Sequence, residues 1–166
     1  RGTEQGLADW MTNLSLGKKR WEQGPARVHG GFLRALDSVW DEIAAELDRL
    51  SCPLFYTGHS LGGALATLAG ARRTPVAIYT FGSPRVGDAA FVTLTAGLPI
   101  HRVDDDRDVV PTVPPQWLGF RHAGALKTVR ESGIGEPEGE TTGGPPKFLA
   151  DHAPINYVDR VRGFRT

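Results

Sequence analysis

The 166-residue chain has one cysteine, no net charge and no long apolar run, and each scarcity excludes a class of protein. The single Cys52 excludes an intrachain disulfide and a zinc site built from cysteines, so packing must stabilise the fold. The 19 basic and 19 acidic residues balance, whereas a nucleic-acid-binding protein is typically basic. No stretch approaches the roughly 18 apolar residues that a membrane span needs. We therefore expect neither a nucleic-acid partner nor a transmembrane segment.

The length fits a single domain, residues 1–166, that can bury a core of its own. No signal-peptide pattern is present, but the chain starts at Arg1 rather than Met, so a leader is not excluded. The chain is expected to be soluble, and secretion is compatible with this composition. Neither the compartment nor the oligomeric state follows from the sequence.

Elements of alternating type follow one another along the chain. Apolar side chains at helical spacing predict an amphipathic helix over residues 32–50. Short apolar runs predict three buried strands, at residues 54–56, 76–81 and 100–103. Helices are predicted between them, over residues 61–71 and from an N-cap at Asp88 to about Gly97. This order predicts an α/β fold with a mostly parallel sheet and helices on both faces. Residues 127–147, rich in Gly, Pro, Glu and Thr, are predicted to form a long surface excursion.

A serine between glycines stands where the first strand would pass into a helix. Gly58-His59-Ser60-Leu61-Gly62 matches G-x-S-x-G, the nucleophile elbow, in the strand–turn–helix context that this motif requires. The turn would strain the serine backbone, and bulk at Gly58 or Gly62 would collide with the neighbouring strand or helix. It would also leave the Ser60 hydroxyl exposed at the carboxyl edge of the sheet, beside the free N–H groups of a helix N-terminus. The pattern predicts a nucleophile; the alternative is a glycine-rich turn with a surface serine.

A nucleophilic serine needs a base, and the base needs a carboxylate that orients it, in the chain order Ser, Asp, His for this turn. Asp108 is the predicted acid because it follows a strand end and precedes a stiff, proline-rich loop. His152 is the predicted base because Pro154 would begin a helix and leave this histidine on the loop before it. The other histidines are expected to be structural: His29, His59, His101 and His122. The other aspartates are expected to cap the strand end or to face solvent: Asp104, Asp105 and Asp106.

Six motifs follow in order over nearly the whole chain: "RGT", "VHGGFLRALDSVW", "GHSLGGALATLAG", "TFGSPRVGD", "DVVPTVPP" and "DHAPINYV". In this order they resemble the class 3 lipases, the fungal-type triacylglycerol lipase family with an α/β-hydrolase fold. The resemblance implies Ser60 as nucleophile, Asp108 as acid and His152 as base. It also implies Thr3 and Leu61 as the oxyanion-hole residues. The Leu61 N–H follows from the elbow as well, whereas Thr3 comes from the resemblance.

Residues 5–14 place four apolar side chains at helical spacing, so a short helix there would have one apolar face: Leu7, Trp10, Met11 and Leu14. The resemblance implies a lid at this position, which covers the acyl pocket in water and swings aside at a lipid surface. An ordinary core helix is the alternative, because periodicity does not separate the two.

The chain departs from the family pattern in three ways. The strands that precede the "RGT" turn in the family are missing, so we expect an N-terminally incomplete domain with an unpaired sheet edge. Asp105 stands where the family often has Asn, and like charges beside Asp108 are expected to raise the pKa of some of these carboxyls. The disulfides of the fungal members cannot form with Cys52 alone.

Together these features predict a hydrolase of lipid carboxylic esters, a triacylglycerol lipase or esterase, that works through an acyl-enzyme without metal or organic cofactor. The expected partner is a lipid or other ester, met at a lipid–water interface. A phospholipase A1, a monoacylglycerol lipase and a feruloyl esterase are alternatives on the same fold, and an apolar lid favours lipid over sugar ester. A non-catalytic lipid-binding or scaffold domain is the alternative of another class. Acyl length and headgroup preference stay open.

Overall fold

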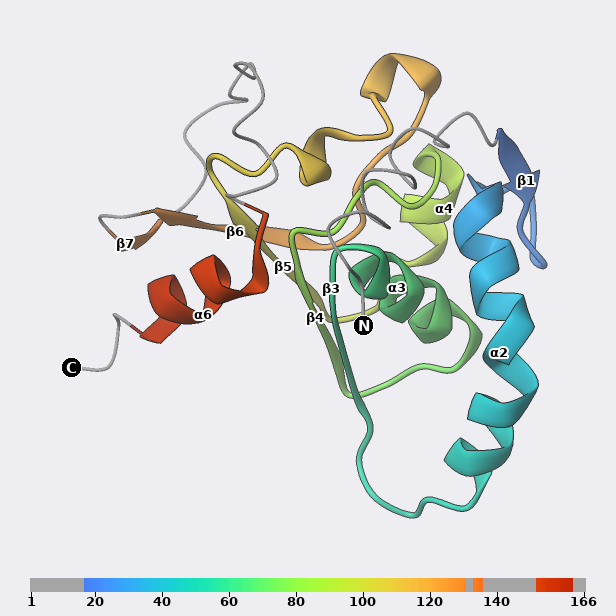
Figure 1. Cartoon of the computed structure of the whole chain (residues 1–166). Coiled ribbons are helices and arrows are strands. Elements are labelled where there is room, and N and C mark those ends of the chain that lie inside the picture. The colour runs from blue at the N-terminus through green and yellow to red at the C-terminus, as the bar shows by residue number, and fades with distance from the viewer. Residues whose placement is uncertain (1–16, 131–132, 136–151, 163–166) are drawn as a thin grey trace.

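The computed structural model describes residues 17–130, 133–135 and 152–162, and its centre is a five-stranded sheet (Figure 1). The strands, in the order in which they pair, are β3 (Phe55–His59), β4 (Ala77–Phe81), β5 (Ile100–Asp105), β6 (Ala125–Arg130) and β7 (Gly133–Gly135). The first four run parallel, and β7 is antiparallel to β6. A second, antiparallel sheet consists of β1 (Lys18–Arg20) and β2 (Arg27–His29), which the sequence patterns did not predict.

The parallel strands end at one edge of the sheet, which brings together loops that are distant in the sequence. His59 of β3 pairs with Phe81 of β4, and Phe81 pairs with Val103 of β5. The turn after β3 and the loops after β4 and β5 therefore leave the sheet side by side. In parallel sheets this carboxyl edge is where ligands bind.

Helices cover both faces of the sheet, as predicted. On one side lie α2 (Gly30–Asp48), α3 (Leu61–Arg72) and α4 (Ala89–Leu94), and on the other lies α6 (Pro154–Arg162) (Figure 1). Strand alternation explains the split, because residues of odd and even number in β4 point to opposite faces. Ile78 packs with Ala66 of α3, whereas the rings of Phe81 and Tyr157 of α6 lie 6.1 Å apart.

Two apolar clusters lie on the α3 side of the sheet. The larger joins α2 and α3 to the segment around β2, and its buried members are Trp21, Ala26, Val28, Phe32, Leu36, Ala64, Leu68, Val86 and Phe91. The smaller joins α3 to the strands through Ala66, Ile78, Ile100 and Ala123. Burial of this apolar surface is the main favourable contribution to the free energy of folding. Packing of these clusters therefore fixes the positions of β3 and α3, and with them the turn at Ser60.

The predicted helices are confirmed, with shifted ends. α2 begins at Gly30, two residues earlier than expected, because His29 acts as its N-cap and its Nδ1 accepts the Phe32 N–H at 3.4 Å. Asp88 caps α4 as predicted, since it accepts the Phe91 N–H at 3.0 Å.

The predicted strands are confirmed too, but the surface excursion is wrong at its start. Residues 127–130 belong to β6, and residues 133–135 form β7. The sequence "KTVR" alternates polar and apolar side chains around Val129, which is typical of a strand, but the glycines and prolines that follow obscured this pattern. The remainder of the excursion, residues 136–147, lies outside the described residues.

Candidate active site

Ser60 occupies a sharp turn between β3 and α3. Its backbone has φ 57° and ψ −126°, the one positive φ among the non-glycine residues that the structure describes. Such a conformation costs on the order of 1–3 kcal/mol and persists only where its surroundings enforce it. Here the Ser60 N–H donates to the Phe81 carbonyl at 2.9 Å, and the Ser60 carbonyl accepts the Gly63 N–H at 2.9 Å. The strained strand–turn–helix geometry predicted from the sequence is confirmed.

Gly58 allows this turn to close, and Gly62 contributes in a different way. A Cβ at Gly58 would lie 2.2 Å from the carbonyl carbon and oxygen of Gly62, inside the backbone of α3. A Cβ at Gly62 would meet none of the described residues within 4 Å. The predicted crowding is therefore confirmed at Gly58 and wrong at Gly62. The backbone of Gly62 lies close to Gly58, but a side chain at Gly62 would point away from the described residues.

The first turn of α3 presents main-chain donors directly after Ser60. Ser60 is the N-cap of α3 and makes no side-chain capping hydrogen bond. First-turn N–H groups have no acceptor within their own helix, and the positive end of the helix dipole favours an anion beside them. The Leu61 N–H is the first of these donors in the 12-residue helix. It is thus suited to stabilise a negative oxygen that forms at Ser60.

Asp108 and His152 form a buried pair. They are 5% and 2% exposed, and the His152 Nδ1 lies 2.6 Å from the Asp108 Oδ2. Since an ionised carboxylate only accepts hydrogen bonds, Nδ1–H donates, and the neutral ring keeps Nε2 as an acceptor. The Asp108 Oδ1 accepts the Val110 N–H at 2.8 Å, which fixes the carboxylate from its other side. α6 begins at Pro154, as predicted, so His152 lies on the loop before it.

His59 holds the loop that carries His152. Its Nε2–H donates to the His152 carbonyl at 2.8 Å, and the two rings lie with their centroids 4.4 Å apart. Burial lowers the pKa of His59, and the charge of His152 lowers it further. A neutral His59 can stay beside a second imidazole that takes up a proton. Because His59 directly precedes Ser60, this contact joins the His152 loop to the serine turn, and the structural role expected for His59 is confirmed next to the two candidate catalytic residues.

Tyr157 shares the Asp108 carboxylate with His152. Its hydroxyl donates to the Asp108 Oδ2 at 2.5 Å and accepts the Asp105 N–H at 3.1 Å. Burial raises the pKa of Tyr157, and the charge of Asp108 raises it further, so the hydroxyl stays protonated and remains a donor. Because Tyr157 belongs to α6, this contact fixes the helix, and the His152 loop before it, against the end of β5.

Gly82, which directly follows β4, leaves the space that this cluster needs. It has φ 54°, a left-handed conformation that favours glycine. A Cβ at Gly82 would lie 2.5 Å from the Asp108 Oδ2, 2.8 Å from the Tyr157 hydroxyl and 3.0 Å from the His152 Cε1. Any side chain there would therefore displace all three groups.

The acidic residues that precede Asp108 are paired with arginine. Asp104 and Asp105 are 7% and 3% exposed, so of the two roles expected for them, capping the strand end or facing solvent, the second does not apply. Asp104 lies 2.5 Å from Arg102, and Asp105 forms an ion pair with Arg160 of α6. Burial raises the pKa of Asp104 most; Arg102 opposes the rise and the charge of Asp108 adds to it. The expected like-charge effect is present, but it is smaller than the effect of burial.

Asp105 also caps the strand end, as predicted, because its Oδ1 accepts the Arg107 N–H at 3.0 Å. Asp106 is half-buried and lies 3.9 Å from Arg160. Each of the three neighbouring carboxylates thus has an arginine within 4 Å. Asp108 is the carboxylate that faces an imidazole.

The Ser60 Oγ and the His152 Nε2 are both buried without a hydrogen-bond partner among the described residues, so they do not hydrogen-bond to each other. Beside Asp108, the same holds for the Asp104 Oδ1, the Asp105 Oδ2, the Asp106 Oδ1 and the Arg160 Nη1. Buried polar atoms are usually paired, and here the first two unpaired atoms belong to the strained serine and to the imidazole that Asp108 orients, the two groups that a nucleophile and its base require. Ser60 is 8% exposed, and the prediction of an exposed hydroxyl is therefore wrong. The sheet edge positions the serine as expected, but tertiary burial decides its exposure. Oriented in this way, His152 can accept a proton at Nε2 while Asp108 stabilises the resulting charge.

The remaining histidines are structural, as expected. The His122 Nε2 lies 2.7 Å from the Pro111 carbonyl oxygen, which joins the segment before β6 to the loop after Asp108. Burial lowers the pKa of His122 well below its usual value, and Arg102 lowers it further. His29 caps α2, and His101 stacks on Tyr79 with the ring centroids 4.9 Å apart.

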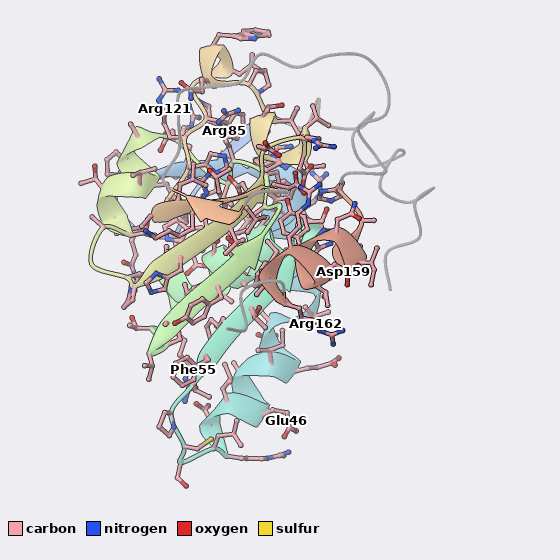
Figure 2. The ribbon with its side chains drawn as sticks, turned by 90° about the vertical axis from the view of Figure 1, so that its left-hand side faces the viewer. Glu46, Phe55, Arg85, Arg121, Asp159 and Arg162 are labelled. Carbon is pink, nitrogen blue, oxygen red and sulfur yellow. The ribbon has the colours of Figure 1, made fainter. Side chains whose placement is uncertain are left out.

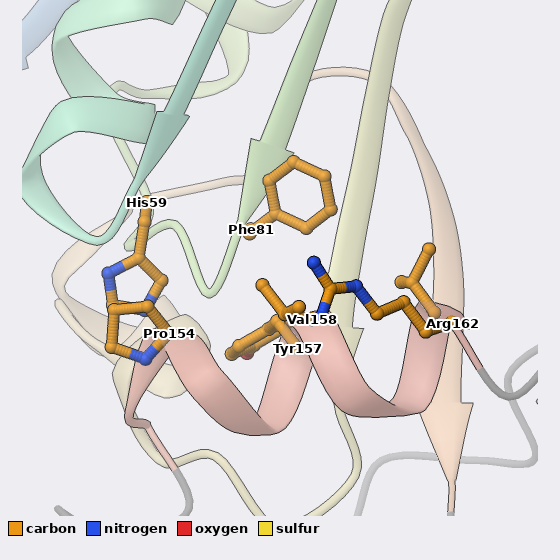
Figure 3. A pocket seen from close by; sticks show the side chains of 7 residues that line it. His59, Phe81, Pro154, Tyr157, Val158 and Arg162 are labelled. Atoms are coloured by element: carbon orange, nitrogen blue, oxygen red, sulfur yellow. The ribbon is translucent and has the colours of Figure 1, made fainter.

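A pocket of about 340 Å³ lies behind the site, between α6 and the ends of β3 and β4 (Figure 3). Its lining is mostly apolar: His59, Phe81, Pro154, Tyr157, Val158, Val161 and Arg162. Two of these, His59 and Tyr157, contact His152 and Asp108 from the rear. Ser60, Asp108 and His152 do not line it, so this pocket borders the site without containing the reactive atoms.

Several sequence predictions lie outside the described residues: the oxyanion-hole residue Thr3 and the lid side chains Leu7, Trp10, Met11 and Leu14. Those roles stay predictions. Within the ranges 17–130, 133–135 and 152–162, no group of three or more His, Cys, Asp or Glu side chains could hold a metal ion. No helix in that same part of the chain combines the length and apolar character that crossing a membrane requires.

Sequence reasoning missed three contributors to the site: Tyr157, Gly82 and Arg160. Tyr157 gave a weak signal, because it is an aromatic residue in the helix that Pro154 begins. Gly82 stands in "FGSP", directly after a predicted strand, where a glycine indicates a turn or a close approach. Arg160 gave no signal, since its partner Asp105 lies 55 positions earlier in the chain and charged pairs of that separation show no sequence pattern.

Comparison with known proteins identifies the family. The family model described as lipase (class 3) matches residues 1–117. The secreted mono- and diacylglycerol lipase 1 of Fusarium solani is 41% identical over 133 residues, covering 70% of this chain and 38% of that protein. The chain therefore spans about two fifths of the length of this relative.

Solved structures show the same fold. The lipase from Rhizopus microsporus var. chinensis superposes with a TM-score of 0.74 at 33% identity, over 92% of this chain and 62% of that one. A triacylglycerol lipase whose catalytic centre is formed by a serine protease triad superposes with a TM-score of 0.68 at 33% identity, over 75% of this chain and 53% of that one. With most of its length matched by the family model and its sheet by these lipases, the chain belongs to the class 3 lipase family and has its α/β-hydrolase fold.

Proposed function

We propose that this protein hydrolyses carboxylic ester bonds of lipids through an acyl-enzyme on Ser60, with His152 as the base and Asp108 as the acid that orients it. The observation that carries the proposal is the pair of buried atoms without partners, the Ser60 Oγ and the His152 Nε2, next to the 2.6 Å contact between His152 and Asp108. The Fusarium relative and the solved triacylglycerol lipase support glycerides as the substrate class.

In the first half of the reaction the His152 Nε2 takes the proton from Ser60 as its Oγ attacks the ester carbonyl. The carbonyl oxygen becomes an oxyanion, which accepts a hydrogen bond from the Leu61 N–H and, by the resemblance, from Thr3. Asp108 stabilises the imidazolium, and the neighbouring His59 remains neutral because its pKa is lowered. His152 then gives the proton to the departing alcohol oxygen, which leaves an acyl group on Ser60.

In the second half, water repeats the attack on the acyl-enzyme. The His152 Nε2 takes a proton from the water, the new oxyanion collapses, and the proton returns to the Ser60 Oγ as the fatty acid leaves. Every bond change in this scheme is made by side chains of this chain and by water.

The burial of the Ser60 Oγ supports a further part of the proposal, that the site is closed in water and opens at a lipid surface. Residues 5–14 are the candidate lid, because their apolar face would be stabilised equally by an apolar pocket and by lipid. We include secretion in the proposal, since the Fusarium relative is described as secreted. Hydrolysis of tributyrin should therefore rise sharply once the substrate exceeds its solubility and forms droplets.

The direct test is covalent labelling with an alkyl fluorophosphonate, which reacts with activated serines. The wild-type protein should be labelled on Ser60 and hydrolyse tributyrin, and Ser60→Ala should lose both properties while it keeps its fold. Parallel assays with a phospholipid and with methyl ferulate identify the ester class. A wild-type protein that is neither labelled nor active would instead be the binding or scaffold domain. Near-normal hydrolysis by Ser60→Ala would also contradict the proposal.

A further inference from the structure

Trp117 is more exposed than any other large apolar side chain in the described part of the chain. It is 83% exposed, and its neighbour Leu118 is 45% exposed. Both belong to a short 3-10 helix, Gln116–Leu118, in the loop between β5 and β6. The indole of Trp117 and the adjacent side chain of Leu118 together present an apolar patch to solvent, and exposed apolar patches are typical of interaction sites.

Hydrogen bonds fix the backbone on both sides of Trp117, so the fold itself places the side chain in solvent. The Gln116 carbonyl accepts the Gly119 N–H at 2.7 Å and an Arg121 Nη1–H at 2.8 Å. Arg85 donates to the Pro114 carbonyl at 3.2 Å, just before the turn. These contacts fix the main chain on both sides of the tryptophan while leaving the indole outside.

Positive charge surrounds the turn. Residues 109–124 contain no Asp or Glu. The exposed Arg121 follows the turn, and the Lys18 Nζ lies 3.4 Å from the Gly119 carbonyl oxygen and 5.3 Å from the centre of the Phe120 ring. Within the described residues, neither Lys18 nor Arg121 has an acidic side chain as partner. Figure 2 shows Arg85 and Arg121 at the end of the molecule from which this loop projects, far from Phe55 and Glu46.

The turn also lies on the side of the sheet where the candidate active site is. The loop that carries it leaves the carboxyl end of β5 and contains Asp108. The Arg121 N–H donates to the Gly87 carbonyl at 2.7 Å, in the segment that follows the carboxyl end of β4. In Figure 1 the loop between β5 and β6 rises above the upper ends of the strands.

We propose that Trp117 and Leu118, flanked by Lys18 and Arg121, anchor the protein to a lipid surface that carries anionic headgroups. This inference rests on the proposed function, because an enzyme that meets its substrate at an interface needs a fixed contact there. Tryptophan suits this place because its ring buries apolar area at the headgroup level while its N–H stays hydrogen-bonded. The two cations add attraction to negative lipid, and their spacing around the turn would orient the carboxyl edge of the sheet toward the surface.

The test measures binding to vesicles in the Ser60→Ala background, in which the lipid is not consumed. The protein should bind phosphatidylcholine vesicles that contain phosphatidylglycerol, with a blue shift of tryptophan fluorescence. Trp117→Ala should weaken this binding by roughly tenfold or more, because the indole supplies most of the buried apolar area. Phe55→Ala is the matched control: it removes another exposed aromatic side chain, 59% exposed, from the opposite end of the molecule, and binding should stay unchanged.

Charge is tested separately. Lys18→Gln and Arg121→Gln should each reduce the preference for anionic over neutral vesicles by roughly fivefold, and Arg34→Gln, the same change on an exposed arginine of α2, should not. With active protein, Trp117→Ala should lower the rate on tributyrin droplets relative to the rate on a dissolved ester. Wild-type binding by Trp117→Ala, or an equal loss in Phe55→Ala, would overturn the anchor. The anchor and the proposed function can fail separately, because vesicle binding is measured without catalysis. Vesicle binding can be absent although Ser60 of the wild-type protein is labelled, and it can be present although the wild-type protein hydrolyses no ester.

Discussion

The turn at Ser60 and the pair formed by Asp108 and His152 lie in the same site, but they are built in different ways. Main-chain contacts shape the turn: the Ser60 N–H reaches the Phe81 carbonyl, and Gly58 lies against the backbone of α3. Side chains from distant segments shape the pair, because Tyr157 and His59 hold Asp108 and His152 in place.

This difference predicts how each region responds to mutation. A structure made by backbone contacts is broken by added bulk and tolerates the loss of polar atoms, since few side chains take part. A structure made by side-chain hydrogen bonds is broken by the loss of single polar atoms, because each buried partner left behind costs free energy. Variants that remove one atom, or add one, therefore separate the two regions.

The largest effect is expected from Asp108→Asn. An amide in place of the carboxylate no longer stabilises a protonated His152, and it favours the tautomer that carries its proton on Nε2. The turnover number for a dissolved ester such as p-nitrophenyl butyrate should fall by a factor on the order of 10⁴. Circular dichroism should show an intact fold, because the substitution keeps the shape of the side chain.

Asp105→Asn is the matched comparison. It removes an equal charge from the same strand end, but from a carboxylate that Arg160 pairs. Activity should change by less than about tenfold, with the larger effect on stability. If Asp105→Asn lost more activity than Asp108→Asn, the acid would have been assigned to the wrong residue.

The next largest effect is expected from Gly58→Ala, which tests the turn by bulk. The new Cβ would lie 2.2 Å from main-chain atoms of Gly62, so the free energy of unfolding should fall by about 3 kcal/mol or more. Gly62→Ala meets no described neighbour and replaces glycine in a helix, so it should leave stability unchanged or raise it by up to about 1 kcal/mol. Urea denaturation followed by tryptophan fluorescence measures both. Equal destabilisation by the two variants would contradict the asymmetry between these glycines.

The turn was predictable from the sequence because its determinants are local. Gly58 and Ser60 stand two residues apart between a strand pattern and a helix pattern, and the backbone of that segment carries most of the geometry. The pairing of Asp108 with His152 was predictable by a different route, from chain order and from the prolines that punctuate both loops. Both routes use information that lies within a few residues of each group.

What the sequence could not provide were contacts that depend on how distant elements pack. Tyr157 faces Asp108 only because α6 crosses the end of β5 at a particular height and rotation, which no periodicity specifies. The exposure of the Ser60 hydroxyl was mispredicted for the same reason, since burial depends on tertiary neighbours. The pairing of Asp105 with Arg160, likewise, followed from the position of α6 rather than from the acidic run.

Tyr157→Phe tests the side-chain-built region by removing a single oxygen. The ring still fills its place beside Phe81, but Asp108 loses a donor and the Asp105 N–H loses its acceptor. The turnover number should fall by about tenfold, which corresponds to about 1.4 kcal/mol. Without the hydroxyl, the carboxylate attracts the proton on His152 more strongly, so the acid limb of the pH–rate profile should move to higher pH.

A purely structural role for Tyr157 would lower activity without moving that limb, so the pH profile distinguishes the two. Tyr56→Phe is the control, because it removes a hydroxyl that is buried without a hydrogen-bond partner among the described residues. Activity and pH profile should both stay close to wild type in that variant. A shift of the acid limb in Tyr56→Phe would show that the effect is not specific to the Asp108 carboxylate.

The last expected effect concerns the pH dependence of stability, to which a buried histidine outside both regions contributes. His122 holds the Pro111 carbonyl in the loop after Asp108, and burial lowers the pKa of His122 well below its usual value. Below about pH 6.5 the unfolded chain binds a proton at this histidine while the folded chain does not, so acid favours unfolding. The free energy of unfolding should therefore fall between about pH 7 and pH 5, by up to about 1.4 kcal/mol per pH unit from this group. In His122→Gln part of this slope should vanish. Urea titrations at pH 5, 6 and 7 measure how the free energy of unfolding changes with pH in the wild-type protein and in the variant. An unchanged slope in His122→Gln would assign the pH dependence to His59, because its lowered pKa acts in the same direction. His59 lies between the serine turn and the pair of Asp108 and His152.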